Sequence, residues 1–265
     1  MIELKKVGEY LKSNGKEIDQ EDYLRQQVEW TNASEGDIQG FRCERCKNKG
    51  FVATVHNEEE KYVECECMAK RRAEKYIEKS GIKETMERMT FDTFEEKQAW
   101  QKNVKDKAKK FLKSDARMFF VGGQSGSGKT HIGTAVAGFY LRKGVRTQYI
   151  KWRTEVGKLK RNVNEDYYEQ RMKELANVPV LYIDDLLKSQ SGKDFTQADA
   201  QVAWELIDSR NQNGKKTIVS SEYTLEELVD LEDSLAGRIF EQSQSEFAIS
   251  IPKGMQHNLR LKAVK

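Results

Sequence analysis

Short strand-forming runs alternate with longer charged segments along the second half of the chain. The runs lie at residues 118–121, 147–150, 180–185, 217–220 and 247–251. Short continuous apolar runs are typical of strands buried on both faces, and Pro252 would stop the last one. Helical segments separate them, and strands that alternate with helices form parallel sheets. We therefore expect a three-layer α/β domain over residues 114–265.

The first part of the chain has a different pattern. Residues 1–40 are polar and helical in character, and two runs at 51–55 and 61–64 have the length of hairpin strands. A basic helix is expected over about 68–79, and Gly81 would end it. These patterns predict an N-terminal domain over residues 1–80, a charged linker over 81–113 and the α/β domain after it.

A glycine-rich loop follows the first strand of the α/β domain. It fits G-x-x-x-x-G-K-[ST], the Walker A P-loop, because a strand precedes it and a helix follows. Such a loop turns its backbone N–H groups toward the phosphates of ATP or ADP at the positive end of the helix. The expected nucleotide-binding residues are Gly123, Gln124, Ser125, Gly126, Ser127, Gly128, Lys129, Thr130 and His131. Lys129 would reach the β- and γ-phosphates, and Thr130 would bind Mg²⁺.

The apolar run at 180–185 ends in two carboxylates, as a Walker B strand does. Asp184 would hold the magnesium through a water molecule, beside Thr130. Asp185 would orient and polarise the attacking water, because one carboxylate on the metal cannot also serve as the base. The alternative is a pair of solvated acids that cap the next helix.

Composition limits the function further. The 265 residues include 46 basic and 43 acidic ones, and the formal charge of +3 gives no general affinity for nucleic acid. Mean hydropathy is −0.80. No apolar stretch approaches the roughly 20 residues that span a bilayer, and the polar N-terminus does not fit a signal peptide. We expect a cytoplasmic protein with no membrane partner.

All four cysteines lie in one short window as two close pairs, Cys43 with Cys46 and Cys65 with Cys67. In a reducing compartment such pairs favour thiolate ligands over disulfides. A structural Zn²⁺ site across the expected hairpin, within residues 41–68, fits this spacing. His56 could replace one cysteine, and free buried thiols are the other alternative.

From about Phe41 to Lys262 the chain resembles the DnaC/DnaI-type helicase loaders of the AAA+ class, which include phage-encoded members. The resemblance lies in the cysteine cluster, the segment at 90–94, the P-loop, the Walker B segment, residues 217–221 and residues 237–239. It implies an N-terminal domain that grips the hexameric replicative DNA helicase. It also implies ATPase domains that associate side by side, bind single-stranded DNA and help place the ring on a melted strand.

The resemblance assigns further residues. A γ-phosphate sensor would be Glu222 or a flanking serine, and Arg238 would be inserted into the nucleotide site of a neighbouring subunit. The alternative for Arg238 is a surface salt bridge to Glu232, Asp233 or Glu241. Arg260 lies where a second sensor would be.

A local basic patch offers a place for DNA. Lys151, Trp152 and Arg153 follow the second strand, and Lys158, Lys160 and Arg161 come soon after. A base could stack on Trp152 while the cations meet phosphates. Equally, Trp152 could belong to the core and the lysines to a solvated helix face.

Two other functions fit the same ATPase core. One is an IstB-like transposition helper, which assembles on duplex DNA with a transposase. The other is a nucleotide-gated adaptor or inhibitor of a replication protein, which Glu222 at the sensor position would suit. The cysteine cluster favours a loader over the transposition helper.

Overall fold

The computed structural model describes residues 20–161, 165–188 and 195–262. The chain divides into two compact units, residues 1–71 and 72–265, which are described separately. The helical pattern expected over residues 1–19 lies outside the described residues.

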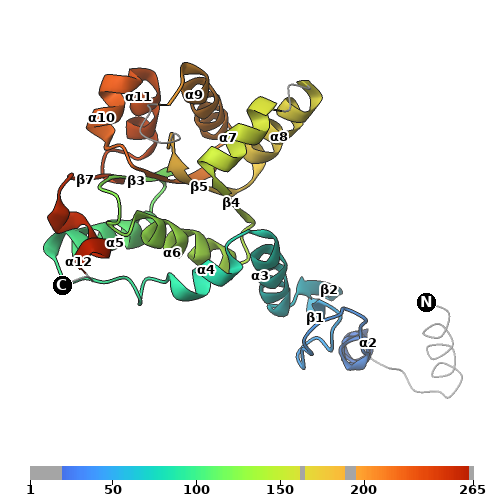
Figure 1. Cartoon of the computed structure of the whole chain (residues 1–265). Coiled ribbons are helices and arrows are strands. Elements are labelled where there is room, and N and C mark those ends of the chain that lie inside the picture. Colours follow the sequence, from blue (N-terminus) through green and yellow to red (C-terminus); the bar gives the residue numbers. More distant parts are fainter. Residues whose placement is uncertain (1–19, 162–164, 189–194, 263–265) are drawn as a thin grey trace, which may run out of the picture. The chain divides into compact units, whose positions relative to one another are not determined.

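The N-terminal unit contains helix α2 (Gln20–Ala33) and a hairpin of β1 (Phe51–His56) and β2 (Glu59–Glu64) (Figure 1). The hairpin turns at Asn57 and Glu58, whose φ values of 53° and 60° are those of the tight turns that join antiparallel strands. Asn32 ties α2 to β1, because its side chain donates to the carbonyl of Ala53 and accepts from the Ala53 N–H, each at 2.9 Å. The expected hairpin is confirmed.

The second unit is built on a parallel sheet. Its strands are β3 (Met118–Gly123), β4 (Thr147–Lys151), β5 (Val180–Leu186), β6 (Lys216–Ser221) and β7 (Ala248–Ile251). Their order across the sheet is β4-β5-β6-β3-β7, and every neighbouring pair is parallel. The predicted α/β P-loop fold is confirmed, and β3, β5 and β6 end side by side at one edge.

Helices cover both faces of this sheet (Figure 1). The helices that follow the hairpin in the chain are α3 (Cys67–Lys79), α4 (Lys83–Arg88), α5 (Ala99–Phe111), α6 (Lys129–Arg142), α7 (Trp152–Arg161), α8 (Glu165–Asn177), α9 (Gln197–Gln212), α10 (Leu225–Leu231), α11 (Asp233–Gln242), the 3-10 helix η1 (Met255–His257) and α12 (Leu259–Lys262). One apolar cluster joins α4, α5 and α6 to the sheet, and a second joins α7 to α11 to its other face. The P-loop, which follows β3, lies at the edge of the sheet between these two layers of helices.

The segment 81–113, expected as a linker, contains α4 and α5. Val104, Ala108 and Phe111 of α5 are buried in the cluster on the α6 face of the sheet. The inward face of α5 also carries Gln101 and Lys105, and the Lys105 ammonium forms an ion pair with Glu96. Because polar residues occupy part of the buried face, the periodic pattern of this helix is hidden in the sequence.

Candidate functional site: the P-loop edge and the cysteine cluster

The P-loop connects β3 directly to α6, as its sequence predicts. Gly126 and Gly128 have φ values of +76° and +87°, a conformation that side-chain-bearing residues rarely adopt. A Cβ on Gly126 would lie 2.3 Å from Oδ1 of Asn258. The loop therefore has no room for a side chain at this position. Helix α6 begins at Lys129, and its N-terminus therefore opens into the loop, where an anion is favoured.

Lys129 is almost fully buried behind this loop. Its ammonium donates to the carbonyl oxygens of Gly123, at 2.9 Å, and Gln124, at 2.7 Å. Burial lowers the pKa of Lys129 to about 8, against the opposing influence of Glu222 and Asp185. The ammonium is thus held at the loop by groups that a phosphate oxygen can replace.

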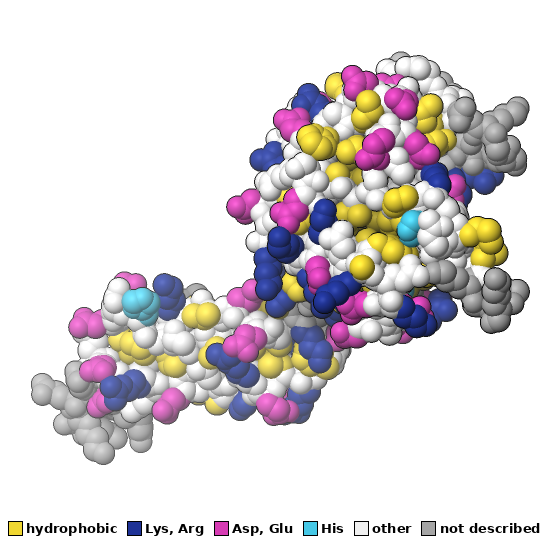
Figure 2. Space-filling model, turned by 90° about the vertical axis from the view of Figure 1, so that its left-hand side faces the viewer, with side chains coloured by type: hydrophobic (Ala, Val, Ile, Leu, Met, Phe, Trp, Pro, Cys, Tyr) yellow, Lys and Arg dark blue, Asp and Glu magenta, His cyan; other side chains and the backbone are white. Residues whose placement is uncertain are grey.

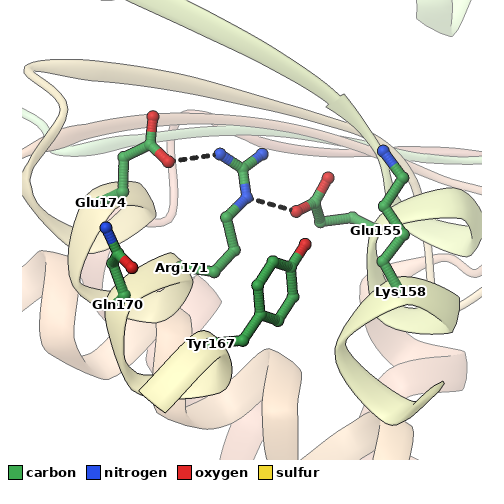
Figure 3. A pocket seen from close by; sticks show the side chains of 6 residues that line it. All are labelled: Glu155, Lys158, Tyr167, Gln170, Arg171 and Glu174. Atoms are coloured by element: carbon green, nitrogen blue, oxygen red, sulfur yellow. Dashed lines mark hydrogen bonds and ion pairs between the residues drawn. The ribbon is translucent and has the colours of Figure 1, made fainter. Parts of the chain in front are cut away.

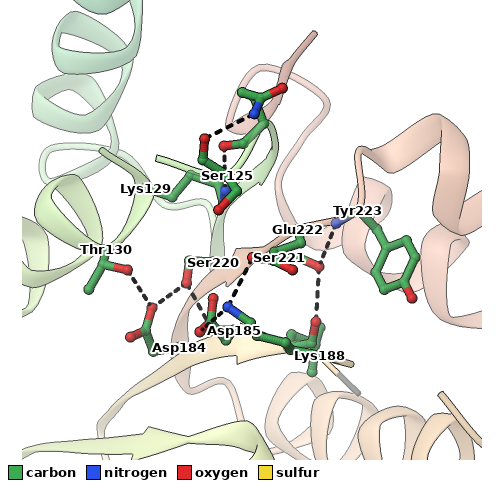
Figure 4. A network of polar contacts seen from close by, with 12 residues as sticks. Ser125, Lys129, Thr130, Asp184, Asp185, Lys188, Ser220, Ser221, Glu222 and Tyr223 are labelled. Carbon is green, nitrogen blue, oxygen red and sulfur yellow. Dashed lines mark hydrogen bonds and ion pairs between the residues drawn. The ribbon is translucent and has the colours of Figure 1, made fainter. Parts of the chain in front are cut away.

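The carboxylate of Asp184 accepts hydrogen bonds from four hydroxyl groups, of which Figure 4 shows those of Thr130 and Ser220. Thr130 donates at 3.1 Å, Tyr182 at 2.9 Å and Ser220 at 2.5 Å to Oδ1, and Tyr149 donates at 3.0 Å to Oδ2. Asp184 is 4% exposed, and within the described residues no ion pair reaches it. A buried carboxylate held by neutral donors, with a threonine hydroxyl alongside, fits a hard cation such as Mg²⁺.

Sequence reasoning identified Thr130 and Asp184 but missed the two tyrosines. Burial and the Asp184 carboxylate raise the pKa values of both Tyr149 and Tyr182, so each phenol stays protonated and donates. Tyr182 reaches this position because Gly133 of α6 has no side chain: a Cβ there would lie 2.6 Å from the phenol oxygen. The sequence contains one signal for Tyr182. This residue lies two positions before Asp184 in the strand, which places both side chains on one face of β5.

Asp185 and Glu222 lie at the ends of the neighbouring strands β5 and β6. The ammonium of Lys188 contacts both carboxylates, at 3.1 Å from Asp185 Oδ2 and 2.9 Å from Glu222 Oε1 (Figure 4). The structure therefore brings the two predicted carboxylates together around a lysine that the sequence analysis did not single out.

His131 lies on the first turn of α6 and faces residues 90–94. Its Nε2–H donates to the carbonyl of Thr90 at 2.9 Å, and its ring packs edge-on against Phe94. The C-terminal segment lies on another part of the loop, because the Leu259 N–H donates to the Gly126 carbonyl at 2.9 Å. A Cβ built on Gly126 would lie 3.4 Å from Cγ of Arg260, so Arg260 borders the P-loop.

Arg238 lies on α11 and is paired within its own chain. Its guanidinium contacts Asp208 at 3.0 Å and Glu241 at 3.0 Å. Of the alternatives raised by the sequence, the single chain thus shows the ion pair to Glu241, with a second partner on α9. A role in a neighbouring subunit would require both contacts to break.

The four cysteines of the N-terminal unit form one cluster. Their Sγ atoms all lie within 4.8 Å of one another, with 3.8 Å between Cys43 and Cys65 and 3.5 Å between Cys46 and Cys67. A tetrahedral zinc with Zn–S bonds of about 2.3 Å needs sulfurs roughly 3.8 Å apart. The residues present fit a zinc ion in both number and spacing.

Within this cluster the pKa of one thiol, Cys46, is lowered, whereas burial raises the pKa values of Cys65 and Cys67. Burial acts to raise the pKa of Cys46, but hydrogen bonds from the Gly50 N–H and from the other thiols lower it to about 6. His56 ends β1 and pairs with Glu59 beside the hairpin turn, whereas Cys65 follows the opposite end of the hairpin. The ligand set assembled by the structure is the four cysteines, without His56.

The residues of the basic patch after β4 differ in their environment, and Lys151 and Arg153 are exposed. Trp152 is 2% exposed and belongs to the core, so the alternative in which a base stacks on it is wrong for this structure. Lys160 forms an ion pair with Asp199 at 2.5 Å. On the face drawn in Figure 2, basic and acidic side chains are interspersed.

A polar pocket of about 430 Å³ lies between α7 and α8 (Figure 3). Its lining consists of Glu155, Lys158, Tyr167, Gln170, Arg171 and Glu174. Arg171 is tied to Glu155 at 2.5 Å and to Glu174 at 2.6 Å. Two carboxylates hold this arginine, so the pocket offers little excess positive charge to a phosphate.

The fold and the P-loop edge define the chain as an ATP-binding protein of the AAA+ class. A family model described as IstB-like ATP binding protein matches residues 48–236. The chain belongs to this family.

Individual relatives support the assignment of the chain to this family. The phage-like element PBSX protein XkdC of Bacillus subtilis (strain 168) is 29% identical over 243 residues, which are 88% of this chain and 91% of that protein. The uncharacterized protein YqaM of the same organism is 29% identical over 209 residues, 75% of this chain. The match spans 66% of the length of YqaM. The crystal structure of DnaI has the same fold, with a TM-score of 0.51 and 18% identity over 64% of this chain and 93% of that one.

None of the helices in the described part of the chain is long and apolar enough to cross a membrane.

Proposed function

We propose that this protein is an ATP-dependent helicase loader. It binds the hexameric replicative DNA helicase through its N-terminal unit and helps to place the helicase on single-stranded DNA during replication initiation. The observation that carries this proposal is the four-cysteine cluster ahead of the AAA+ domain. A zinc held there would stabilise a separate small unit, as expected for a domain dedicated to a protein partner.

The surface of the N-terminal unit supports a protein partner. Trp30 on α2 is 57% exposed, and Tyr62 and Val63 on β2 are 56% and 49% exposed. Aromatic side chains are enriched in the buried centres of protein interfaces. We infer that these side chains contact the helicase.

At the nucleotide site we infer the following roles. Lys129 binds the β- and γ-phosphates, and the backbone N–H groups from Gly123 to His131 surround the phosphate chain. Thr130 and Asp184 hold Mg²⁺, which neutralises phosphate charge when bound. Asp185 orients the attacking water, with the sensor position occupied by Glu222.

ATP acts as a conformational switch in this proposal, and its slow hydrolysis resets the protein. The ATPase domains associate so that Arg238 of one chain reaches the nucleotide of the next. Because Arg238 is paired with Asp208 and Glu241 in the single chain, assembly must supply contacts that replace both pairs. Assembly on single-stranded DNA is expected to stimulate hydrolysis for this reason.

Size-exclusion chromatography with the cell's hexameric replicative helicase, with and without ATP, tests the proposal. We expect a large complex that contains both proteins. The double variant Trp30→Ala/Tyr62→Ala should lose it. Val229→Ala removes an apolar side chain of similar exposure, 47%, from α10 and serves as the control that retains it. No complex of the unmodified chain under either condition would contradict the loader function.

A transposition helper is the second candidate, because the matched family model is named for an IstB-like protein. Such a helper assembles on duplex DNA, so ATP-dependent binding to duplex DNA without helicase binding would favour it. An adaptor or inhibitor would bind the helicase but block unwinding. Measured ATP hydrolysis with and without single-stranded DNA separates that function from a working loader.

A further inference from the structure

Lys188 is brought to the nucleotide site by an irregular turn at the end of β5. One extra residue is accommodated between Ile183 and Leu186 relative to β6, which marks a β-bulge. Asp185 and Leu187 then adopt φ values of +58° and +60°, which are uncommon for residues with side chains. The Lys188 N–H closes the turn by donating to the Asp185 carbonyl at 3.0 Å. Strain of this kind persists where the surrounding structure holds it, and it is concentrated at functional sites.

The turn places the Lys188 ammonium between two carboxylates that come from different strands. It lies 3.1 Å from Asp185 and 2.9 Å from Glu222, and its side chain is 38% exposed. Burial acts to raise the pKa of Glu222, but hydrogen bonding and attraction from Lys188 outweigh it and the pKa falls below its usual value. The two carboxylates therefore share one cation.

Without Lys188, the carboxylates at this edge would outnumber the ammonium groups. Three carboxylates lie here, from Asp184, Asp185 and Glu222, and Lys129 supplies one positive charge behind the P-loop. The ammonium of Lys253 donates to the Glu222 backbone carbonyl at 2.7 Å, but it is paired with Glu227. A hydrogen bond between Ser125 and Glu222 contributes to the lowered pKa of Glu222, which places that carboxylate next to the loop that surrounds the phosphates. A polyphosphate that enters this edge brings further negative charge, and partly buried like charges repel strongly.

We propose that Lys188 is a positioning residue of the nucleotide site, which balances the charge of Asp185 and Glu222 beside the terminal phosphate and fixes the Asp185 carboxylate. It thereby lets a glutamate occupy a position where an uncompensated carboxylate would repel ATP. The inference rests on the proposed phosphate-binding roles of this edge. Its effect is larger on ATP than on ADP, because the terminal phosphate of ATP lies nearest to the ends of β5 and β6.

Titrations of the full-length chain alone with Mg²⁺–ATP and Mg²⁺–ADP test this. Lys188→Ala should weaken ATP binding about tenfold, the size of one lost charged hydrogen bond, and ADP binding by less than about threefold. Glu222→Gln in the Lys188→Ala background should recover most of the ATP affinity, and Lys188→Arg should keep it. Lys143→Ala is the matched control: it removes an exposed lysine at the far end of α6, roughly 20 Å from the P-loop, and should change neither affinity.

Rescue by Glu222→Gln is the result that a merely structural role would not produce. An unchanged ATP affinity in Lys188→Ala, or an equal loss for ATP and ADP that Glu222→Gln does not restore, would overturn the inference. These titrations use the chain alone, so neither result depends on helicase binding, which is measured separately. A chain that forms no helicase complex would still show the expected ATP and ADP affinities.

Discussion

The two units of this chain are stabilised by different means. In the described part of the N-terminal unit the buried cluster consists of Cys46, Cys65 and Cys67 with a few partly buried neighbours, and α2 has no buried residue. The ATPase unit has a large apolar cluster on each face of its sheet. The zinc ion that we propose for the cysteine cluster would add stability to the small core described here, whereas the larger unit folds by burial of apolar surface. We therefore expect that either unit can be disabled while the other keeps its activity.

Removal of the zinc ligands should have the largest effect. Cys43→Ser changes the most exposed of the four cysteines, so it disturbs packing least while it breaks the ligand set. We expect about one zinc per purified chain, its loss in the variant, and unfolding of the N-terminal unit with loss of helicase binding. Metal analysis and limited proteolysis measure this, and ATP affinity should stay unchanged. A metal-free protein that remains resistant to protease would show that the unit folds without zinc.

The converse change is Lys129→Ala. It removes the ammonium that the P-loop carbonyls hold, and ATP affinity should fall by more than about a hundredfold. Zinc content and protease resistance of the N-terminal unit should not change. A normal ATP titration of this variant would exclude the P-loop as the nucleotide site.

The pH dependence of ATP binding should come from the same lysine. Burial lowers the pKa of Lys129 to about 8 in the free chain, so the ammonium is present below pH 8 and is lost as the pH rises above it. Bound phosphate requires the ammonium, and ATP affinity should therefore fall about fivefold from pH 8 to pH 9. Calorimetry in two buffers of different ionisation enthalpy should show uptake of roughly half a proton per ATP at pH 8. Binding without proton uptake would contradict this assignment.

The smallest expected effect concerns the phenols on Asp184. Tyr182→Phe removes one of four hydroxyl donors and should reduce Mg²⁺-dependent ATP affinity by about two- to fivefold. Tyr140→Phe is the control, because the Tyr140 hydroxyl is also buried but has no hydrogen-bond partner within the described residues. Titrations at several Mg²⁺ concentrations compare the two. An equal effect of both variants would show that general packing, and not the Asp184 contact, is responsible.

Local patterns predicted the parts of the molecule that depend on local sequence. Short runs and residue spacings predict the parallel strands, the P-loop turn and the cysteine pairs. The structure contains the strands, the loop and the cysteine cluster as expected. Helix α5 was missed because Gln101 and Lys105 stand on its buried face. A pattern of apolar residues does not reveal a helix that turns polar side chains toward the core.

The missed site residues depend on long-range arrangement. Tyr149 and Tyr182 meet at Asp184 because β4 and β5 pair in a register that sets the two tyrosines opposite each other. Lys188 reaches its carboxylates through a bulge and a left-handed turn made by residues other than glycine. Neither the register nor that turn has a recognisable signature in a single sequence.

The close approach of Gly133 to Tyr182 also limits how such a chain can diverge. A Cβ on residue 133 would lie within 2.8 Å of the ring as well as of its hydroxyl, so removal of the oxygen alone makes no room. A side chain at position 133 therefore requires a change at position 182 as well. Among relatives, a residue larger than glycine at position 133 is expected where position 182 carries a side chain smaller than an aromatic ring, and correlated substitution of this kind would be visible in an alignment of the family.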